Sequence, residues 1–391
     1  MNRREFLSMT VATAAMSALD SRPAFAQDAK YKACVIGDAK NGGYGHNMHM
    51  LFMMRDDVEI VGLSEPIKKA REYYQKQCGA LRTYPGYAEM LSTEKPDLVA
   101  IGPRWTTNHK EYLLACAEAG AHGIMEKPLT ADLAEADEII AAIDAKNLKW
   151  AAALNFRASP MIRKVKKLVF EEGLIGEVLE IRSRGKEDQR AGGEDLIVLG
   201  IHTLDMMNYF LGKVASCDAT VLVDGRPAVA SDVKEASEPL GPIVGDAIHA
   251  KYIYENGIPA YFSTVQNPDG NQNRWGMEIH GTKGILSIRM NPVPDVYHLA
   301  DASWAPGRKG TDWQRIEPPD SDPSRHEHVG HYAPIVDDLI QSIEQDHQPF
   351  TSLHAIRDAH EMIQAVWQAA VTRERVDFPL VEREHPLRNW T

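Results

Sequence analysis

The stretch KACVIGDAKNGGYGHN, residues 32–47, decides the fold of this 391-residue chain. Its first residues form a short apolar run that ends at Gly37, which is typical of a buried parallel strand. A glycine-rich segment follows, and residues 46–54 then have a helical pattern. This order predicts the first strand, turn and helix of an α/β sheet.

The following hundred residues repeat the alternation of strands and helices. Strand-like runs lie at 58–64, 97–102 and 122–126, and helical patterns at 66–77, 108–119 and 132–146. Strands that alternate with helices at this spacing predict a doubly wound parallel sheet. We expect this domain at residues 27–150 and a second α/β domain at residues 151–391.

The second half of the chain has a different pattern, with many short strands before its last helices. The strand-like runs are 176–186, 217–224, 246–255, 259–267, 275–281 and 284–289. Residues 332–345 and 352–372 have apolar residues at helical spacing. The segment 292–325 is rich in proline, glycine and aspartate, which predicts a long surface or lid loop.

Composition limits the classes of function. Apolar residues make up 44% and charged residues 25% of the chain, an ordinary globular balance that excludes a disordered or membrane-spanning protein. The net charge of -12 would repel phosphate backbones, so we expect no nucleic-acid partner. The four cysteines, at positions 34, 78, 116 and 217, are too scattered for a disulfide scaffold.

Residues 1–26 have the order of a signal peptide. Arg3 and Arg4 precede an apolar run at 6–19, and Ala24-Phe25-Ala26 supplies the small residues of a cleavage site. The run is too short for stable membrane insertion. The paired arginines predict a twin-arginine signal, and therefore a periplasmic or secreted protein exported in folded form. A Sec signal that happens to begin with two arginines is the alternative.

The glycine-rich turn and the end of the second strand predict a dinucleotide site. In a doubly wound sheet, glycines let the backbone approach a pyrophosphate, and an acidic residue after the second strand binds the ribose hydroxyls. Gly37, Gly42 and Gly45 lie in the turn, and Glu65 lies at the acidic position. A carboxylate there favours NAD over NADP. Four residues separate Gly37 from Gly42 instead of one, so a plain glycine-rich turn is the alternative.

Several later motifs resemble one enzyme family. MEKPL at 125–129 resembles the EKP motif of the Gfo/Idh/MocA oxidoreductases, and NFR at 155–157, GGEDLIVLGIHTLD at 192–205 and GTKG at 281–284 resemble later segments of that family in the same order. The resemblance implies a Rossmann domain followed by an α/β domain with a large, mostly antiparallel sheet. It also implies sugar or polyol substrates and a homo-oligomer, a dimer or a tetramer.

The resemblance assigns roles to individual residues. Lys127 contacts the substrate hydroxyl and helps to position the nicotinamide, His202 acts as acid/base, and Asp205 binds another hydroxyl. An ammonium group would stabilise a developing alkoxide, and an imidazole suits proton transfer near neutral pH. The remaining residues implied by the resemblance are Asn155 and Arg157 at the substrate, and Pro103 and Glu126 at the cofactor.

The chain departs from the family pattern at its acid/base pair. The family usually has Asp four residues before this His, and here the position is Val198. Glu194 and Asp195, one helical turn earlier, are the substitutes that we expect at the substrate. The segment after the strand at 97–102 is also about two residues longer than the family pattern.

Histidines near the C-terminal helices form a second cluster. His326, Glu327, His328 and His331 have ligand types that zinc or manganese accept, but no CxxC or HExxH motif accompanies them. We therefore favour a solvated or substrate-lining patch and expect no metal.

Three functions are compatible with these residues. The first is a periplasmic NAD(P)-dependent oxidoreductase that acts on a hydroxyl of a sugar, polyol or glycoside and holds its cofactor tightly. The second is a redox-neutral NAD-dependent glycoside hydrolase or lyase, with which the altered acid/base pair agrees. The third is a non-catalytic sugar-binding protein, against which Lys127, His202 and Glu65 argue.

Overall fold

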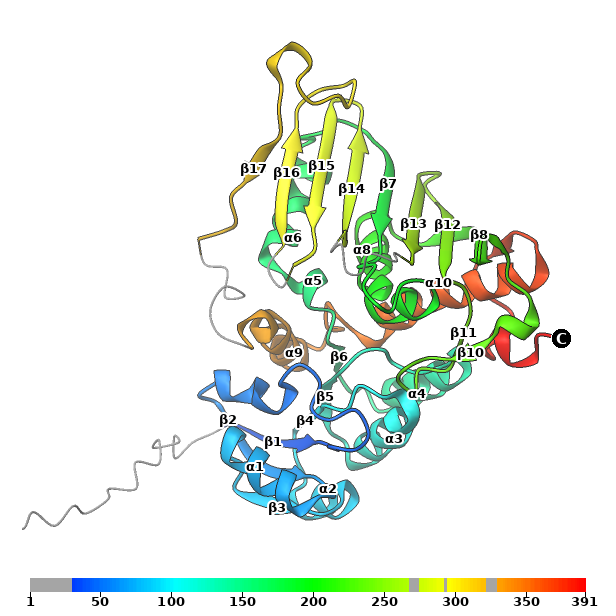
Figure 1. The fold of residues 1–391 in the computed structure, drawn as a ribbon. Coiled ribbons are helices and arrows are strands. Elements are labelled where there is room, and N and C mark those ends of the chain that lie inside the picture. Colours follow the sequence, from blue (N-terminus) through cyan, green and yellow to red (C-terminus); the bar gives the residue numbers. More distant parts are fainter. Residues whose placement is uncertain (1–29, 267–273, 292–293, 321–328) are drawn as a thin grey trace, which may run out of the picture.

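The first half of the chain folds around a parallel sheet of six strands. The computed structural model describes residues 30–266, 274–291, 294–320 and 329–391 (Figure 1). The strands are β1 (Tyr31–Ile36), β2 (Val58–Ser64), β3 (Arg82–Tyr84), β4 (Leu98–Ile101), β5 (His122–Met125) and β6 (Trp150–Ala152). Their order is β3-β2-β1-β4-β5-β6, with every neighbour parallel, which confirms the predicted doubly wound sheet.

Helices connect these strands. They are α1 (Lys68–Cys78), α2 (Tyr87–Glu94), α3 (His109–Ala119) and α4 (Leu133–Ala145). Gly120 ends α3 at a φ of 76°, a left-handed conformation that glycine adopts without steric cost. The segments β3, α2 and β6 did not stand out in the sequence, because each is too short to display a hydrophobic period.

The second half of the chain forms a ten-stranded sheet in the order β17-β16-β15-β14-β7-β13-β12-β8-β18, with β9 paired to β8. Its longer strands are β7 (Val178–Arg184), β8 (Val214–Val223), β12 (Ala247–Tyr254), β13 (Pro259–Val265), β14 (Gly276–Gly281) and β15 (Gly284–Arg289). Only β13 and β7 pair in parallel, so the sheet is mostly antiparallel, as the resemblance implies. Helices α6 (Pro160–Lys166), α8 (Ile201–Leu211) and α10 (Leu353–Thr372) lie along one side of it (Figure 1).

The predicted loop at 292–325 is partly wrong. It contains β16 (Asp295–Leu299) and β17 (Gln314–Ile316), which extend the sheet beyond β15. Val296 and Leu299 are fully buried, and this burial against the neighbouring strand outweighs the turn-rich composition around them. Residues 292–293 and 321–325 lie outside the described residues.

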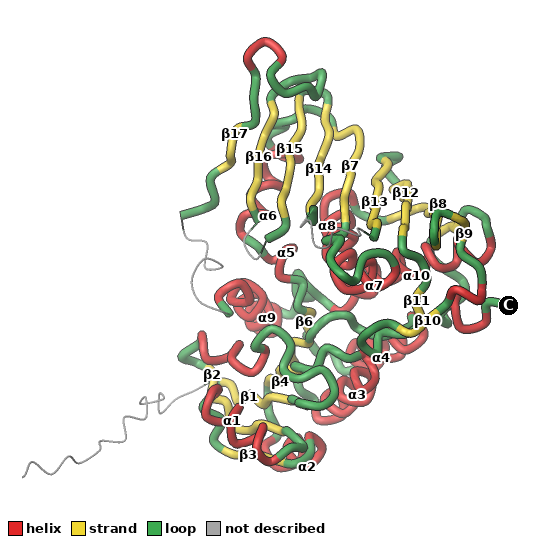
Figure 2. The backbone as a smooth tube through the Cα atoms, viewed as in Figure 1, coloured by secondary structure: helices red, strands yellow, loops and turns green. Residues whose placement is uncertain are grey.

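A helix of the second half completes the core of the first. Ile335, Val336 and Leu339 of α9 (Ala333–Gln345) belong to the same buried cluster as Val35 of β1. Figure 2 shows α9 beside the parallel sheet, between it and the large sheet. The two sheets are therefore linked by a shared core as well as by the chain between them.

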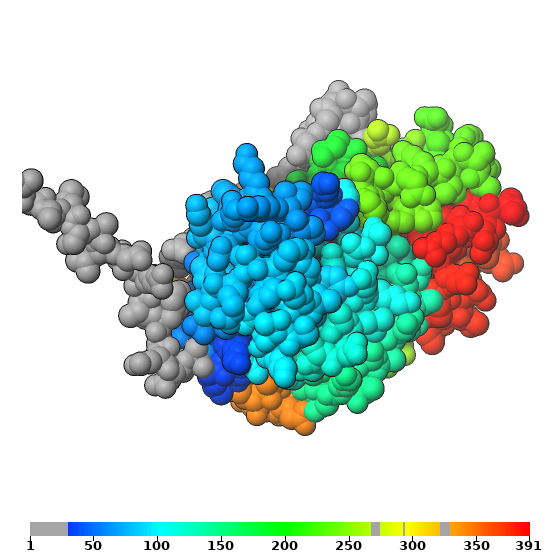
Figure 3. All heavy atoms as spheres, turned by 90° about the horizontal axis from the view of Figure 1, so that it is seen from below, coloured from blue at the N-terminus to red at the C-terminus, as the bar shows by residue number. Residues whose placement is uncertain are grey.

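The C-terminal tail joins both halves. The Arg383 guanidinium binds Asp137 of α4 (Nε–Oδ2 2.7 Å) and Glu361 of α10 (Nη1–Oε1 2.6 Å). In Figure 3 the C-terminal residues, in red, lie beside the cyan-to-green residues of the first half and the light green residues of the second half. None of the described helices is long and apolar enough to cross a bilayer.

Candidate active site

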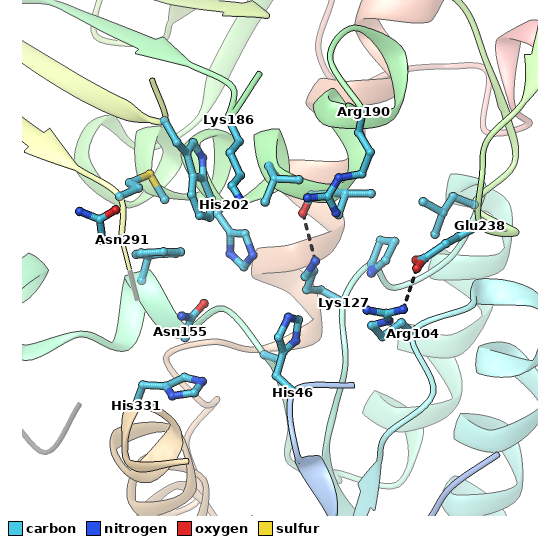
Figure 4. Close-up of a pocket in the computed structure, with 18 of the residues that line it drawn as sticks. His46, Arg104, Lys127, Asn155, Lys186, Arg190, His202, Glu238, Asn291 and His331 are labelled. Carbon is cyan, nitrogen blue, oxygen red and sulfur yellow. Dashed lines mark hydrogen bonds and ion pairs between the residues drawn. The ribbon is translucent and has the colours of Figure 1, made fainter. Parts of the chain in front are cut away.

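A cavity of about 570 Å³ lies where the two sheets meet. This volume lies within the usual range of small-molecule and cofactor pockets. Figure 4 shows Lys127 and His46 entering it from the Rossmann side and His202 from the α8 side. Of the predicted site residues, Lys127, Asn155 and His202 line the cavity.

Lys127 follows β5 at the carboxyl edge of the parallel sheet and is 6% exposed. Its ammonium donates to the carbonyl oxygen of Val198 over 3.0 Å (Figure 4). Burial lowers the pKa of Lys127, Glu126 opposes this, and Arg190 and Arg104 lower the pKa further. The lysine is therefore a poorly solvated amine at the edge where ligands bind in this fold.

The backbone explains why Val198 offers an acceptor. Residues Leu196–Gly200 form a π-helix between α7 (Gly193–Asp195) and α8, and π-turns interrupt the regular ladder of helix hydrogen bonds. The Val198 carbonyl accepts from Lys127 within this turn. At the position where the family usually has a carboxylate, this chain presents a neutral backbone oxygen to the lysine.

His202 lies in the first turn of α8 with 5% of its surface exposed. Its ring makes edge contacts with Phe156 and Trp275, with centroids 5.3 and 5.8 Å away. Burial, and then the charge of Lys127, hold the pKa of His202 well below 6.5. Nδ1 has no hydrogen-bond partner among the described residues. The ring is thus neutral at physiological pH.

We expect turnover on a confirmed substrate to stay level as the pH falls from 8 to 6. An imidazole with its ordinary pKa of about 6.5 would lose about three-quarters of its neutral form by pH 6. The folded pKa of His202 is lower, so the neutral base persists through this interval and is lost only at more acidic pH. The kcat–pH profile measures this, and a fourfold fall between pH 8 and 6 would contradict it.

Glu126 supports the site from beneath the cavity instead of lining it. Its buried carboxylate accepts from the backbone N–H of His46 (3.0 Å), from His46 Nδ1 (2.6 Å) and from the backbone N–H of Lys127 (3.0 Å). A Cβ at Gly45 would lie 2.4 Å from Glu126 Cγ, so only glycine permits this approach. The carboxylate ties the glycine-rich turn to the EKP segment.

Asp205 and Arg157 bind each other, and neither lines the cavity. Arg157 donates from Nε to Asp205 Oδ2 (3.0 Å), and its Nη2 lies 2.6 Å from Oδ1. Their contact with the substrate stays a prediction. His202 and Asp205 are neighbours on the surface of α8, and in this structure the Asp205 carboxylate meets Arg157.

Glu194 and Asp195, the expected substitutes for the missing carboxylate, bind other groups of the protein in this structure. Glu194 accepts from the backbone N–H of Ser237 (3.0 Å) and from its hydroxyl, and Asp195 accepts from the Thr264 hydroxyl (2.6 Å) and two backbone N–H groups. Neither lines the cavity, and their contact with the substrate stays a prediction.

On the cofactor side, Glu65 follows β2 as predicted but is fully buried. Its Oε2 accepts from the Ala39 N–H (2.9 Å) and the Tyr44 hydroxyl (3.1 Å), and its Oε1 accepts from the Ile67 N–H (2.8 Å). The Tyr44 ring covers Gly37, where a Cβ would lie 2.1 Å from Tyr44 Cζ. Tyr44 therefore stands where this fold binds the adenosine ribose.

The other glycines of the turn serve packing within the protein. Gly42 has a φ of 94°, and a Cβ there would lie 2.5 Å from the backbone nitrogen of Arg104. The predicted helix at 46–54 is a short 3-10 helix, Met48–Met54. Pro103 lies two residues after the end of β4, and its carbonyl oxygen lies 2.8 Å from His109 Nε2. In this conformation Tyr44 packs on Gly37 and donates to Glu65 at the position where this fold binds the adenosine ribose.

We expect Tyr44→Ala to bind NAD at least about fivefold more tightly than the unmodified chain. The wild-type turn must release the hydrogen bond to Glu65 before a ribose takes its place, and such a bond contributes about 1 kcal/mol. Calorimetric titration with NAD measures this. Tyr44→Phe, which keeps the ring but not the hydroxyl, should fall between the two. Weaker binding by Tyr44→Ala, in a chain of unchanged circular dichroism, would make Tyr44 a support of the site.

The sequence did not reveal several charged residues that line the cavity. The cations Arg104, Lys186 and Arg190 and the carboxylate Glu238 contribute to its wall. They lie in loops with mixed charge, which is typical of a solvated surface. Of the histidine cluster, His331 lines the cavity, and residues 326–328 lie outside the described residues.

Two protein-family descriptions match most of the chain. The oxidoreductase family with a NAD-binding Rossmann fold, GFO_IDH_MocA, matches residues 32–153. The C-terminal alpha/beta domain of the same oxidoreductase family matches residues 167–378.

Several characterised proteins are similar in sequence. Levoglucosan dehydrogenase of Pseudarthrobacter phenanthrenivorans is 30% identical over 226 residues, which cover 52% of this chain and 57% of that protein. Myo-inositol 2-dehydrogenase of Thermotoga maritima is 28% identical and covers 59% of this chain and 72% of its own length. D-apiose dehydrogenase of Paraburkholderia graminis is 23% identical over 373 residues, which cover 91% of this chain and 92% of that protein.

Solved structures share the fold. Levoglucosan dehydrogenase in complex with NADH and levoglucosan has a TM-score of 0.72 and 20% identity, covering 89% of this chain and 99% of that one. An oxidoreductase from Agrobacterium radiobacter in complex with NAD+, L-tartaric acid and magnesium has a TM-score of 0.67 and 19% identity, covering 89% and 98%.

Proposed function

Since this chain belongs to the GFO/IDH/MocA oxidoreductase family, we propose that it oxidises a hydroxyl of a sugar, polyol or glycoside with a tightly held NAD. The observation that carries the proposal is the pairing of a buried ammonium, Lys127, with a neutral imidazole, His202, at one cavity. Relatives named as levoglucosan, inositol and apiose dehydrogenases support a sugar or polyol as the substrate.

The two side chains divide the work on one hydroxyl. A nicotinamide held here would supply the acceptor for a hydride from the carbon that carries this hydroxyl. His202, neutral at physiological pH, accepts the hydroxyl proton, and Lys127 stabilises the negative charge that develops on the oxygen. The Val198 carbonyl accepts a hydrogen bond from the Lys127 ammonium and in this way fixes its direction.

Other residues of the cavity suit a sugar ring. Trp275 and Phe156 lie edge to face at 5.0 Å and offer an apolar surface to the C–H face of a pyranose. Asn155 adds an amide that is able both to donate and to accept hydrogen bonds with hydroxyl groups. Glu65 favours NAD over NADP, since its carboxylate would repel a 2′-phosphate.

Purified protein tests the proposal. Release of nicotinamide by acid, seen by its absorbance, is expected if the cofactor is tightly held, and its absence would favour a sugar-binding protein. A panel of sugars and polyols with added NAD should give NADH from at least one member. The absence of NADH from every member, in a chain that binds NAD, would contradict net oxidation.

A redox-neutral reaction is the second candidate, and Val198 is the observation that favours it. The usual acid/base carboxylate is absent at this position, so the pair that remains differs from that of a simple dehydrogenase. Release of nitrophenol from a nitrophenyl glycoside, dependent on bound NAD but without net NADH, would identify this reaction.

We also propose that the chain forms a homo-oligomer. Sedimentation velocity measures the mass of the assembly.

We propose export through the twin-arginine pathway, on the basis of Arg3, Arg4 and the cleavage site Ala24-Phe25-Ala26. Residues 1–29 lie outside the described residues. Changing both arginines to lysine should leave the precursor in the cytoplasm, because this pathway reads the arginine pair. Cell fractionation and the size of the protein measure this, and normal export of the double variant would favour a Sec signal.

A further inference from the structure

The charged groups that line the cavity are mostly positive. Among the described residues of its wall, Arg104, Lys127, Lys186 and Arg190 are cations, and Glu238 is the one carboxylate. Figure 4 shows Lys186 and Arg190 reaching toward the cavity from the side opposite His46. A site for a neutral sugar needs acceptors for hydroxyl protons, and this wall offers mainly donors.

Pairing within the protein leaves part of this positive charge uncompensated. Glu238 Oε1 lies 2.7 Å from Arg104 Nη2, so these two charges compensate each other. Lys127 donates to a neutral carbonyl oxygen, that of Val198, and to no carboxylate of the wall. The cavity therefore retains charge that a ligand is able to meet.

Lys186 and Arg190 come from one loop and share one carboxylate. Asp188 binds Arg190 through both of its oxygens, with an Nε–Oδ1 distance of 3.0 Å, and Lys186 Nζ lies 3.6 Å from Oδ2. These two cations of the wall therefore share a carboxylate that does not itself line the cavity. Their side chains are 30% and 27% exposed, so both are partly desolvated and still accessible from the cavity.

Glu194 and Asp195 add negative charge near Arg190 and help to raise its pKa, but they act from outside the cavity wall. Their carboxylates accept from Ser237, Thr264 and backbone N–H groups. A neutral ligand that displaced water would desolvate the cavity side of Lys186 and Arg190 without supplying an anion there, which is unfavourable. A ligand carboxylate would supply the missing anion through charge-assisted hydrogen bonds.

We infer that the substrate is an acidic sugar of monosaccharide size, whose carboxylate binds Lys186 and Arg190 while a ring hydroxyl meets Lys127 and His202. This inference rests on the proposed function and specifies its substrate class. A carboxylate is able to accept from both Lys186 and Arg190, the two cations that the wall presents on this side of the cavity. A phosphate ester carries about twice the charge of a carboxylate and would face Glu238 in the same cavity.

Matched pairs of sugars test the inference with the full chain saturated with NAD. Calorimetry compares D-glucuronate with D-glucose and D-galacturonate with D-galactose, and D-glucose 6-phosphate forms a third arm. Each uronate is expected to bind at least about tenfold more tightly than its aldose, and added salt should narrow the difference. Equal binding within both pairs, or tightest binding of the phosphate, would overturn the inference.

Single-residue variants show which side chains cause the preference for uronates over aldoses. Lys186→Met should weaken uronate binding about tenfold or more and leave aldose binding unchanged, and Arg190→Met should do the same. Lys68→Met is the control, because that lysine is 82% exposed on α1 and does not line the cavity. If Arg190→Met does not fold, the more exposed Lys186 still decides the result. Equal weakening of both sugars by Lys186→Met would contradict a carboxylate site there.

The outcome is separable from that of the proposed function. Tight uronate binding that Lys186→Met abolishes, without NADH formation, would support the acidic subsite and contradict net oxidation. NADH formation from neutral sugars, with no preference for acids, would support oxidation and overturn the acidic subsite.

Discussion

Replacing Lys127 with methionine lowers turnover on a confirmed substrate by about a hundredfold or more, while NAD still binds. The ammonium is 6% exposed and lies at the cavity with one neutral acceptor, the Val198 carbonyl, so it is available to an oxygen that becomes negative. Its interaction with that oxygen is stronger in the transition state than in the ground state, and its loss should therefore lower kcat more than it raises KM.

Two further variants show whether the loss of turnover is specific to the Lys127 side chain. His202→Ala should cause a loss of the same order, because the neutral ring is the proton acceptor of the proposed reaction. Val198→Ala should change turnover little, since the group that binds Lys127 is the backbone carbonyl and this variant keeps it. Near-normal turnover by Lys127→Met would overturn the proposed role, and the chain would then be better described as a binding protein on an inherited fold.

Replacing Asp205 with alanine lowers the free energy of unfolding by about 3–5 kcal/mol. The carboxylate is 1% exposed and binds Arg157, whose side chain is 13% exposed, through two guanidinium contacts. Removing it leaves the guanidinium largely buried beside Tyr209 and Phe350 without an anion. Burial raises the pKa of Asp205, but the guanidinium opposes this rise and favours the charged carboxylate.

Chemical denaturation measures the effect of Asp205→Ala. The double variant Asp205→Ala/Arg157→Leu should recover part of the loss, because it removes the unpaired charge as well. Glu72→Ala, which breaks an exposed pair with Lys68 on α1, should change stability little. A stability loss below about 1 kcal/mol, together with weaker substrate binding, would instead support the substrate-binding role of Asp205 that its place in the sequence suggested.

The sequence by itself determined the two-domain architecture and the place of Lys127 after a strand of the parallel sheet. Apolar runs that end in glycine and alternate with helical patterns require a parallel sheet, and the EKP segment at the end of a strand requires Lys127 to lie at the ligand edge of that sheet. The burial of such a run is predicted from its own apolar residues, without knowledge of distant parts of the chain. The strands β16 and β17 were missed because few buried residues stand among many turn-forming ones.

Only the tertiary structure decided which polar groups face the cavity. Asp205, Glu194 and Asp195 have the right chemistry and lie within one short segment with His202, yet partners distant in sequence, Arg157, Ser237 and Thr264, bind their carboxylates. Lys186, Arg190 and Arg104 reached the wall from loops that no periodic pattern describes. Tyr44 likewise lies on Glu65 only because the turn folds back over Gly37. Side-chain pairing depends on distances between elements, and these distances exist only once the sheets have packed.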